Sequence, residues 1–383
     1  MNYKEGGLSL IYFDNAATSR KKPEEVYEAF NYYVREIGTS PGRGSYSLGI
    51  QASRMLYQSR KTVADFFGIK EAENVVFTKN STEAINLFFN GFLQRGDHVL
   101  ISSYEHNAVL RPLHALFLNG IIEYTIINEN DLYNDTDCLR KYIKNNTKLV
   151  VLTLASNLTG QLVFSSRIAN FFNNKGIYVF VDASQGAGKK LINIEEDNID
   201  FLAFTGHKDL LAFPGVGGLC SKEKMTIKPL IQGGTGINGD GFINPEAYPD
   251  AYEAGTINMP AIWALKQAIE YINANLSDIK IKEDIILNAI IEGLKPNAKL
   301  VIYNEHHKRV PTVCFNIQGI KSNEVIEYLD KNGVCVRGGI HCAILAHQSI
   351  NTVKTGAIRV SINHFNSLDE VNEFLRVLSK MGD

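Results

Sequence analysis

The sequence has little cysteine and no excess of charge of either sign. Its five cysteines are an odd number among 383 residues, and none belongs to a CxxC pair. Neither a disulfide framework nor a cysteine-ligated zinc cluster is therefore indicated. Lys and Arg total 39 against 41 Asp and Glu, a net charge of −2. This balance argues against a generally basic surface for nucleic acid.

Long apolar runs are also missing. The first fifteen residues, MNYKEGGLSLIYFDN, contain no extended apolar segment of the signal-peptide kind, and no stretch reaches transmembrane length. We therefore expect a cytoplasmic protein without membrane contact. Apolar residues make up 45% of the chain and charged residues 21%, as is typical of globular proteins. A chain of 383 residues exceeds what one hydrophobic core usually serves, so a large and a smaller domain are expected.

Two strand-like apolar runs end beside residues that can do chemistry. One ends at Phe204 and leads into a tight polar turn of Thr205, Gly206, His207 and Lys208. The other runs from Tyr178 to Asp182, and Gln185 lies three residues further on. Similar runs alternate with helical segments along the chain. This alternation predicts a mainly parallel sheet, with functional residues at the carboxyl ends of its strands.

The lysine and the aspartate together indicate pyridoxal phosphate. A lysine amine can form a Schiff base with this cofactor, and an aspartate can pair with its protonated pyridine nitrogen, so that the ring acts as an electron sink. Either residue alone is more often structural, as a surface charge or as a turn or helix cap. Because they occur with a neighbouring histidine, hydroxyl and amide, we assign the whole set to cofactor binding: Lys208, Asp182, Gln185, Thr205 and His207.

Six short elements then carry a family resemblance. In chain order they are NSTEA at 80–84, EHN at 105–107, VDASQ at 181–185, FTGHK at 204–208, EAGT at 253–256 and RGGIHCA at 337–343. With matches from Tyr12 to Asn366, the chain resembles the class V, fold-type I pyridoxal phosphate enzymes. Within them it is most similar to the cysteine desulfurase and selenocysteine lyase group.

This resemblance implies an α/β fold of the fold-type I PLP-dependent transferase kind. A large domain with a mainly parallel sheet flanked by helices is expected at 14–258. A smaller α+β domain is expected at 1–13 and 259–383, joined through a helical stretch from Met259 to about Ile290.

Three of the five cysteines lie in apolar strand runs and are expected to pack in cores rather than react: Cys220, Cys314 and Cys335. The run around the first of them, GVGGLCSKEK at 215–224, is expected to form a strand at the edge of the sheet.

The remaining cofactor residues come from four further segments. Ser81 and Thr82 open a helix, whose first N–H groups favour an anion, and the resemblance assigns them the cofactor phosphate; a plain N-cap explains them equally well. The resemblance places His106 on the face of the pyridine ring. The Asn157 amide can bind the ring hydroxyl or the substrate. Thr256 resembles the threonine that reaches the phosphate of the neighbouring subunit, which implies a homodimer with shared active sites.

Cys342 is the candidate nucleophile. It lies in a glycine-rich, non-periodic loop, where Arg337 and His341 could supply the positive charge that favours a thiolate. On these features alone a loop thiol without a role is equally plausible. RGGIHC is similar to the RxGxHC of short-loop desulfurases, whose cysteine accepts sulfur. The family proline after that cysteine is replaced here, where Ile344 and Leu345 follow Ala343.

Arginines supply the candidate groups for the substrate carboxylate. Arg359 lies in a strand run, and its guanidinium presents two parallel donors that suit an α-carboxylate. An edge arginine paired with a structural acid is the alternative. Arg43 and Tyr46, in the Gly- and Ser-rich stretch 38–49, could also reach a substrate, although a flexible connection explains the glycines there.

The resemblance implies an enzyme that acts on an amino acid. The favoured reaction is that of a cysteine desulfurase, in which Lys208 with His106 moves the α-proton and L-cysteine becomes L-alanine. The sulfur passes to Cys342 as a persulfide and then to an acceptor protein. The alternatives are a selenocysteine lyase, another class V reaction (an aminotransferase, epimerase or C–S lyase), and a non-enzymatic scaffold that binds a sulfur carrier. No metal site is expected.

Overall fold

A computed structural model describes residues 10–236 and 241–381, which form two compact units. The larger unit holds 22–154 and 163–274, and the smaller unit holds the described residues of 1–21, 155–162 and 275–383. The compact units assign 14–21, 155–162 and 259–274 differently from the expected domains. A division by contacts does not test domain limits, so the expected limits stay a prediction. None of the helices described is both long and apolar enough to cross a membrane.

The larger unit is built on a seven-stranded sheet with the order β2-β8-β7-β6-β5-β3-β4. Strands β3 to β7 run parallel, and β8 is antiparallel to both of its neighbours. The strands are β2 Val75–Thr78, β3 Asp97–Ser102, β4 Ile122–Ile127, β5 Thr147–Thr153, β6 Tyr178–Asp182, β7 Phe201–Thr205 and β8 Gly217–Ser221. The expectation of a mainly parallel sheet is confirmed.

The position of β8 corrects one expectation. We expected this strand at the sheet edge, but it lies between β7 and β2, and β2 forms the edge. Its two glycines explain how it fits there. A Cβ atom on Gly217 would lie 2.6 Å from the Phe204 carbonyl oxygen, and one on Gly218 would lie 2.5 Å from the Phe204 ring. The glycines therefore reflect close packing inside the sheet.

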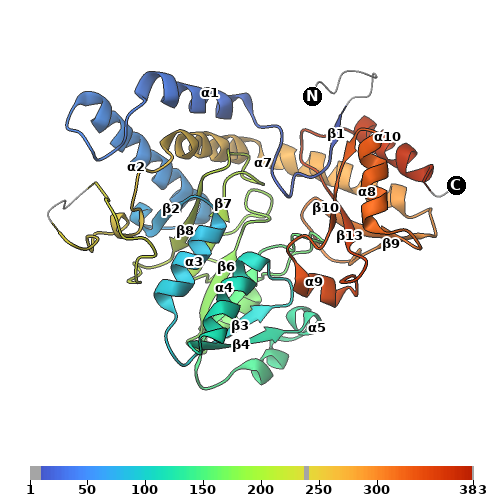
Figure 1. The fold of residues 1–383 in the computed structure, drawn as a ribbon, viewed down its shortest axis with the longest axis horizontal. Helices are drawn as coiled ribbons and strands as arrows, with labels where there is room; N and C mark the ends of the chain where they lie inside the picture. Colours follow the sequence, from blue (N-terminus) through green and yellow to red (C-terminus); the bar gives the residue numbers. More distant parts are fainter. Residues whose placement is uncertain (1–9, 237–240, 382–383) are drawn as a thin grey trace. The chain divides into compact units, whose positions relative to one another are not determined.

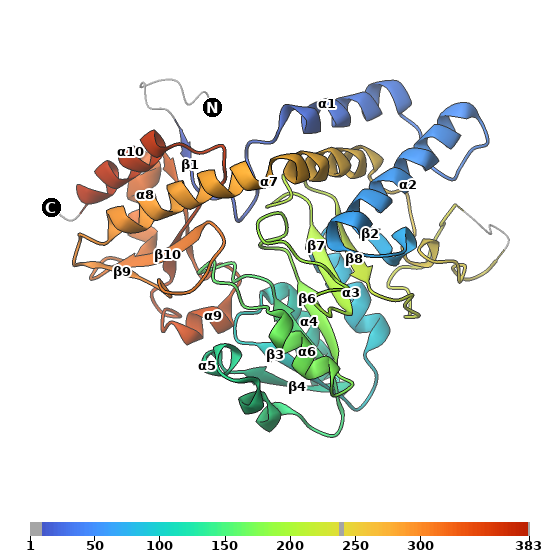
Figure 2. The ribbon, with the colours of Figure 1, turned by 180° about the vertical axis from the view of Figure 1, so that it is seen from behind.

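Helices cover both faces of this sheet. Figure 1 presents the face with α3 and α4, and Figure 2, seen from behind, presents the face with α6. Phe88 of α3 packs on Phe180 and Phe201, with ring centroids 4.8 and 4.4 Å away. The helices are α1 Glu24–Tyr32, α2 Ser47–Phe67, α3 Ser81–Phe92, α4 Asn107–Leu118, α5 Glu129–Tyr133, α6 Ser166–Asn173 and the first part of α7 Met259–Leu294, with the π-helical η1 Tyr33–Ile37 and the 3-10 helices η2 Ala72–Asn74, η3 Thr136–Tyr142 and η4 Asp250–Tyr252.

The smaller unit contains a four-stranded antiparallel sheet with the order β12-β13-β10-β9 and a short parallel pair, β1 with β11. Alternate residues of β10 (Val313, Phe315, Ile317) form a core with α8, α10 and the second part of α7. This α+β arrangement agrees with the expected smaller domain. The elements are β1 Ile11–Tyr12, β9 Leu300–Ile302, β10 Thr312–Ile317, β11 Val334–Cys335, β12 Arg337–Gly339, β13 Ala357–Ser361, α8 Ser322–Lys331, α9 Ile344–Ser349 and α10 Leu368–Ser379.

Candidate active site

The lysine turn follows directly on β7 and is fixed by backbone hydrogen bonds. The Gly206 N–H donates to the Val216 carbonyl at 2.9 Å, and the Leu211 N–H donates to the Lys208 carbonyl at 2.9 Å. A Cβ atom on Gly206 would lie 2.9 Å from Val216 Cγ1, so glycine allows the turn to pack against the next segment. The half-buried Lys208 therefore extends from a rigid backbone rather than from a mobile loop.

Asp182 lies beside this turn at the end of β6. Its side chain is 2% exposed, and its Oδ1 accepts from the Ser184 N–H at 2.9 Å and the Ser184 hydroxyl at 2.5 Å. Asp209, next to the lysine, accepts from the Gly186 N–H at 2.7 Å. The segments after β6 and β7 are thus tied together, which brings Asp182 and Lys208 into one cluster, as the strand-end rule predicted. Asp209 was not predicted, because nothing in the sequence distinguishes it from a surface acid.

Burial and neighbouring positive charge keep His207 neutral. Burial is the largest cause that lowers its pKa, to about 4, and the ammonium groups of Lys208 and Lys22 lower it further. Lys22 itself is partly buried, with Nζ 5.6 Å from the centroid of the Phe213 ring, and burial lowers its pKa to about 8. His207 can therefore bind a ligand by hydrogen bonds but not by charge.

Glu105 joins two strand ends behind His106. Its Oε1 accepts from the Ser102 hydroxyl at 2.5 Å, at the end of β3, and from the Thr153 N–H at 2.7 Å, at the end of β5. Burial raises the pKa of this carboxyl to about 8, and the charge of nearby Asp182 raises it further. Glu105 is therefore a neutral acid at pH 7. Its place in the EHN element predicts no role for it.

His106 caps helix α4 with its ring. Its Nδ1 accepts from the Ala108 N–H at 3.0 Å, so in the neutral ring the proton sits on Nε2. An imidazole fixed in this way presents a single N–H to a ligand. The arrangement is compatible with stacking on a flat ring, the role that the resemblance gave it.

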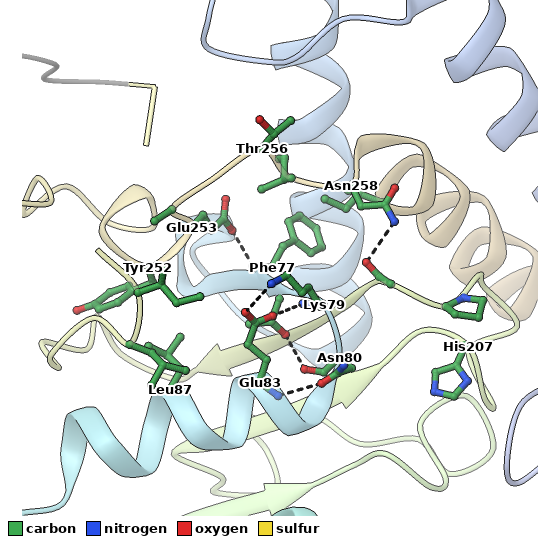
Figure 3. Close-up of a pocket in the computed structure, with 18 residues that line it drawn as sticks. Phe77, Lys79, Asn80, Glu83, Leu87, His207, Tyr252, Glu253, Thr256 and Asn258 are labelled. Carbon is green, nitrogen blue, oxygen red and sulfur yellow. Dashed lines mark hydrogen bonds and ion pairs between the residues drawn. The ribbon is translucent and has the colours of Figure 1, made fainter. Parts of the chain in front are cut away.

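The start of helix α3 borders a cavity of about 500 Å³ in the larger unit (Figure 3). Asn80 caps the helix through a hydrogen bond from the Glu83 N–H at 2.9 Å. Ser81 and Thr82 follow in the first turn, where the first backbone N–H groups have no helix carbonyl to which they can donate. His207 and Thr256 line the same cavity. Three of the expected cofactor segments are therefore brought together.

An unpartnered hydroxyl supports a ligand in this cluster. Thr205 is 3% exposed, and its Oγ1 is buried without a hydrogen-bond partner. Such groups are rare in native folds unless a ligand or water completes them. A free hydroxyl, a helix N-terminus, a buried aspartate and a neutral histidine around one lysine match the charges and donors of pyridoxal phosphate. The residues of the larger unit therefore fit this cofactor.

Arg359 is the centre of a second cluster, in the smaller unit. Its side chain is 1% exposed on β13, an inner strand. The Nη2 group pairs with Asp14 Oδ1 at 2.6 Å, and the Nη1 group donates to the Asn157 carbonyl at 2.7 Å. The Nε atom is buried without a partner. Arg359 thus pairs with an acid, which is the structural role considered as the alternative from the sequence. Its Nε donor nevertheless remains for a ligand.

Asn157 extends this cluster towards the Cys342 loop. Its Nδ2 donates to the His341 carbonyl at 2.8 Å, while its Oδ1 is buried without a partner. Cys342 itself is exposed, and both His341 and Cys342 have left-handed backbone angles, with φ of 54° and 55°. Helix α9 starts at Ile344, where the family has its proline.

One charge expected near Cys342 is not there. We expected His341 to supply positive charge, but burial lowers its pKa to about 2, and the positive charge of Arg359 lowers it further. This ring is therefore neutral. Of the two groups proposed from the sequence, Arg337 is the remaining source of positive charge.

The other cysteines differ from Cys342. Cys220 and Cys314 are fully buried, and burial raises the pKa of both thiols. Burial also raises the pKa of Cys335 in β11. These thiols are in the protein interior or beside it, in agreement with the packing role expected from their strand positions.

Arg43 and Tyr46 lie in a different part of the larger unit. Both are exposed, and Arg43 lines a groove with the glycine-rich segment 232–236 and residues 241–245. Of the expected site residues that the structure describes, only Arg43 lines this groove. Across the described ranges, no three His, Cys, Asp or Glu side chains are grouped as metal ligands.

The comparisons with known proteins agree with one another. The family model described as Aminotransferase class-V matches residues 11–374. A probable cysteine desulfurase of Pyrococcus abyssi is 31% identical, over 97% of this chain and 94% of that protein. One of Methanothermobacter thermautotrophicus is 30% identical, over 97% and 95%. The apo structure of cysteine desulfurase from Thermococcus onnurineus NA1 has a TM-score of 0.89 and 32% identity, and covers 97% of this chain and 94% of that one. The fold-type I architecture and the class V resemblance are confirmed, and this chain belongs to the class-V aminotransferase family.

Proposed function

We propose that the protein is a pyridoxal phosphate-dependent cysteine desulfurase that converts L-cysteine to L-alanine and takes the sulfur on Cys342. The observation that carries this proposal is the cluster in the smaller unit. The Arg359 Nε donor and the Asn157 Oδ1 acceptor are both buried without partners, and hydrogen bonds link their residues to the loop of an exposed thiol. A donor and an acceptor placed in this way suit the carboxylate and ammonium of an amino acid.

The residues of the larger unit would hold the cofactor. Ser81, Thr82 and Thr256 would bind its phosphate, and Asp182 would pair with its ring nitrogen. Once bound, pyridoxal phosphate would supply an electron sink for the pair left on the substrate Cα. Lys208 Nζ would then move the α-proton, assisted by the Nε2–H of His106. His207 would contribute a hydrogen bond without adding charge.

Cys342 would carry out the sulfur transfer. Its thiolate would attack the substrate sulfur, a new S–S bond would form, and the substrate Cβ–S bond would break. The electron pair of that bond would stay with the carbon, and proton uptake there would complete alanine. The products are one alanine and one Cys342 persulfide, so no external oxidant or reductant is needed for this half of the reaction.

Three further features belong to the proposal. Thr256 lines a cavity at the unit's surface, and its resemblance to a residue that acts on the neighbouring subunit supports a homodimer. The exposed thiol supports transfer of its sulfur to an acceptor protein. A persulfide-forming thiol must stay reduced between turnovers, which supports the cytoplasm as the place of action.

The test is alanine release from L-cysteine by the Lys208→Ala variant. The variant should lose at least about 100-fold in rate, the lower range for a positioned acid–base group. Lys190→Ala is the matched control, because Lys190 is exposed on a nearby loop. Full activity of Lys208→Ala would contradict the proposal. Faster turnover of L-selenocysteine than of L-cysteine by the wild type would assign the protein to the lyases instead.

A further inference from the structure

His347 and Thr352, which follow Cys342 in the chain, form a buried array with His341 that no step of the proposed reaction uses. His347 of α9 is 0% exposed, and Thr352, after the helix, is 2% exposed. His347 Nδ1 is 2.6 Å from the Thr352 hydroxyl, and its Nε2 is 3.4 Å from His341 Nδ1. The two imidazole rings are nearly parallel, with centroids 5.6 Å apart. A continuous chain of polar atoms therefore leads from Thr352 to the residue before Cys342.

The loop that carries Cys342 needs such support. Gly339, His341 and Cys342 all have positive φ angles, of 95°, 54° and 55°. For the two residues with side chains this conformation is unfavourable, and it persists only where the surroundings impose it. Helix α9 lies on one side of the loop and has only six residues, too few to be stable by itself.

The contacts show where the support comes from. The His341 carbonyl accepts from Asn157 Nδ2 at 2.8 Å, which fixes one side of its backbone. The His347 N–H donates to the Ala343 carbonyl at 3.0 Å, and the Thr352 N–H donates to the His347 carbonyl at 2.9 Å. The side-chain bonds of His347 add a second contact to the His341 ring itself, which also bonds to the Arg337 backbone.

Both rings are neutral, which lets the array fix their orientation. Burial lowers the pKa of His347 as well as that of His341. A neutral imidazole donates from one nitrogen and accepts at the other, so the directions of the bonds along the array are coupled. His341 Nε2 is buried without a partner, and a bare acceptor is tolerated there more easily than an orphaned N–H.

We propose that His347 and Thr352 are positioning residues that hold the turn presenting the Cys342 thiol for sulfur transfer. The role in sulfur transfer rests on the proposed function, whereas the support of the turn rests on the hydrogen bonds of the array alone. The segment CAILAH at 342–347 departs from the family after the cysteine, and His347 is its last residue.

The experiment uses the cofactor-loaded full chain and four variants. Thr352→Val removes the hydroxyl with little change of shape, and Thr352→Ser keeps it. His347→Phe keeps an aromatic ring without its nitrogens. Gln348→Ala, exposed on the same helix, is the matched control. The two readouts are amide hydrogen exchange in 340–343 and single-turnover persulfide formation on Cys342 from L-cysteine.

Thr352→Val and His347→Phe should speed exchange of the Ala343 amide and slow persulfide formation by about tenfold each, the factor for one buried hydrogen bond. Thr352→Ser and Gln348→Ala should match the wild type. Unchanged exchange in both disrupted variants would overturn the inference, and so would faster exchange with an unchanged persulfide rate. A wild type that forms no persulfide would instead overturn the proposed function, and the exchange readout would still decide whether the array holds the turn.

Discussion

At the scale of single residues, the strand-end rule made Lys208 and Asp182 candidates, because a reactive residue type after an apolar run is visible in the chain itself. Residues whose role depends on distant partners were not found. Asp14 pairs with Arg359 across 345 positions, and Glu105 accepts from a hydroxyl at the end of one strand and a backbone N–H at the end of another. No local pattern marks either of them. His341 was assigned the wrong charge, because the sequence does not reveal how deeply a loop side chain is buried.

The neutral state of Glu105 predicts a pH dependence of stability. Its folded pKa is about 8 against an ordinary value of 4.5. Between these values only the folded state keeps the proton, so this group's contribution to the unfolding free energy falls as pH rises, by about 1.4 kcal/mol per pH unit. Glu105→Gln, which cannot ionise, should become steadily more stable relative to the wild type from pH 5 to pH 8. Urea unfolding at each pH measures this difference, and a constant difference would contradict it.

Asp14→Asn should leave the Arg359 charge buried and unpaired. Burial lowers the pKa of this guanidinium and Asp14 raises it. The loss should lower the unfolding free energy by about 3 kcal/mol, the low end for a broken buried pair, because Asp14 keeps some solvent contact. Added L-alanine should raise the melting temperature more in the variant than in the wild type, since its carboxylate can replace the lost partner. Asp330→Asn, on the surface of α8, is the control. An equal rise in melting temperature for Asp14→Asn and the wild type on adding L-alanine would argue against carboxylate binding by Arg359.

At the scale of elements, periodicity and caps placed the helices well. The long helix expected from Met259 to about Ile290 is α7, Met259–Leu294, and the helix expected to open at Ser81 and Thr82 is α3, Ser81–Phe92. Strand order was harder to predict. The position of β8 inside the sheet depends on close packing at Gly217 and Gly218, which sequence pattern does not separate from the flexibility of an edge.

A buried ion pair fixes the segment that carries Thr256. Arg60 of α2 pairs with both carboxylate oxygens of Glu253, at 2.6 and 2.8 Å, and Glu253 also accepts from the Phe77 N–H at 2.6 Å. Glu253→Ala should lower the unfolding free energy by about 3–5 kcal/mol, because it leaves a buried guanidinium without its partner. Asp65→Ala, which breaks the exposed pair with Lys61 on the same helix, should change stability very little. Similar losses of unfolding free energy in Glu253→Ala and Asp65→Ala would show that the buried pair stabilises the fold no more than the exposed one.

At the scale of the whole molecule, the residues expected around the cofactor fall in the larger unit, apart from Asn157, and those expected around the thiol fall in the smaller unit. The sequence indicated two domains from length and pattern alone. It could not show that 155–162 would join the C-terminal residues, because that assignment depends on contacts with segments such as Val310 and Thr312.

A shared active site predicts complementation between inactive subunits. Lys208→Ala and Thr256→Ala chains, mixed under conditions that exchange subunits, should form dimers in which one of the two sites has both residues intact. With random pairing, roughly a quarter of wild-type activity should return at limiting cofactor. Activity no higher than the average of the two separate variants would contradict a role for Thr256 in the neighbouring site.

The most direct test of the account is release of alanine and sulfide from L-cysteine in the presence of a reductant, with wild type compared with Cys342→Ala. Cys138→Ala is the control, because Cys138 is a half-buried thiol outside the cluster. We expect equal amounts of the two products from the wild type and from Cys138→Ala, and neither from Cys342→Ala. Wild-type rates in Cys342→Ala would contradict the sulfur-transfer role, and a wild type that binds pyridoxal phosphate but makes neither product would contradict the proposed function.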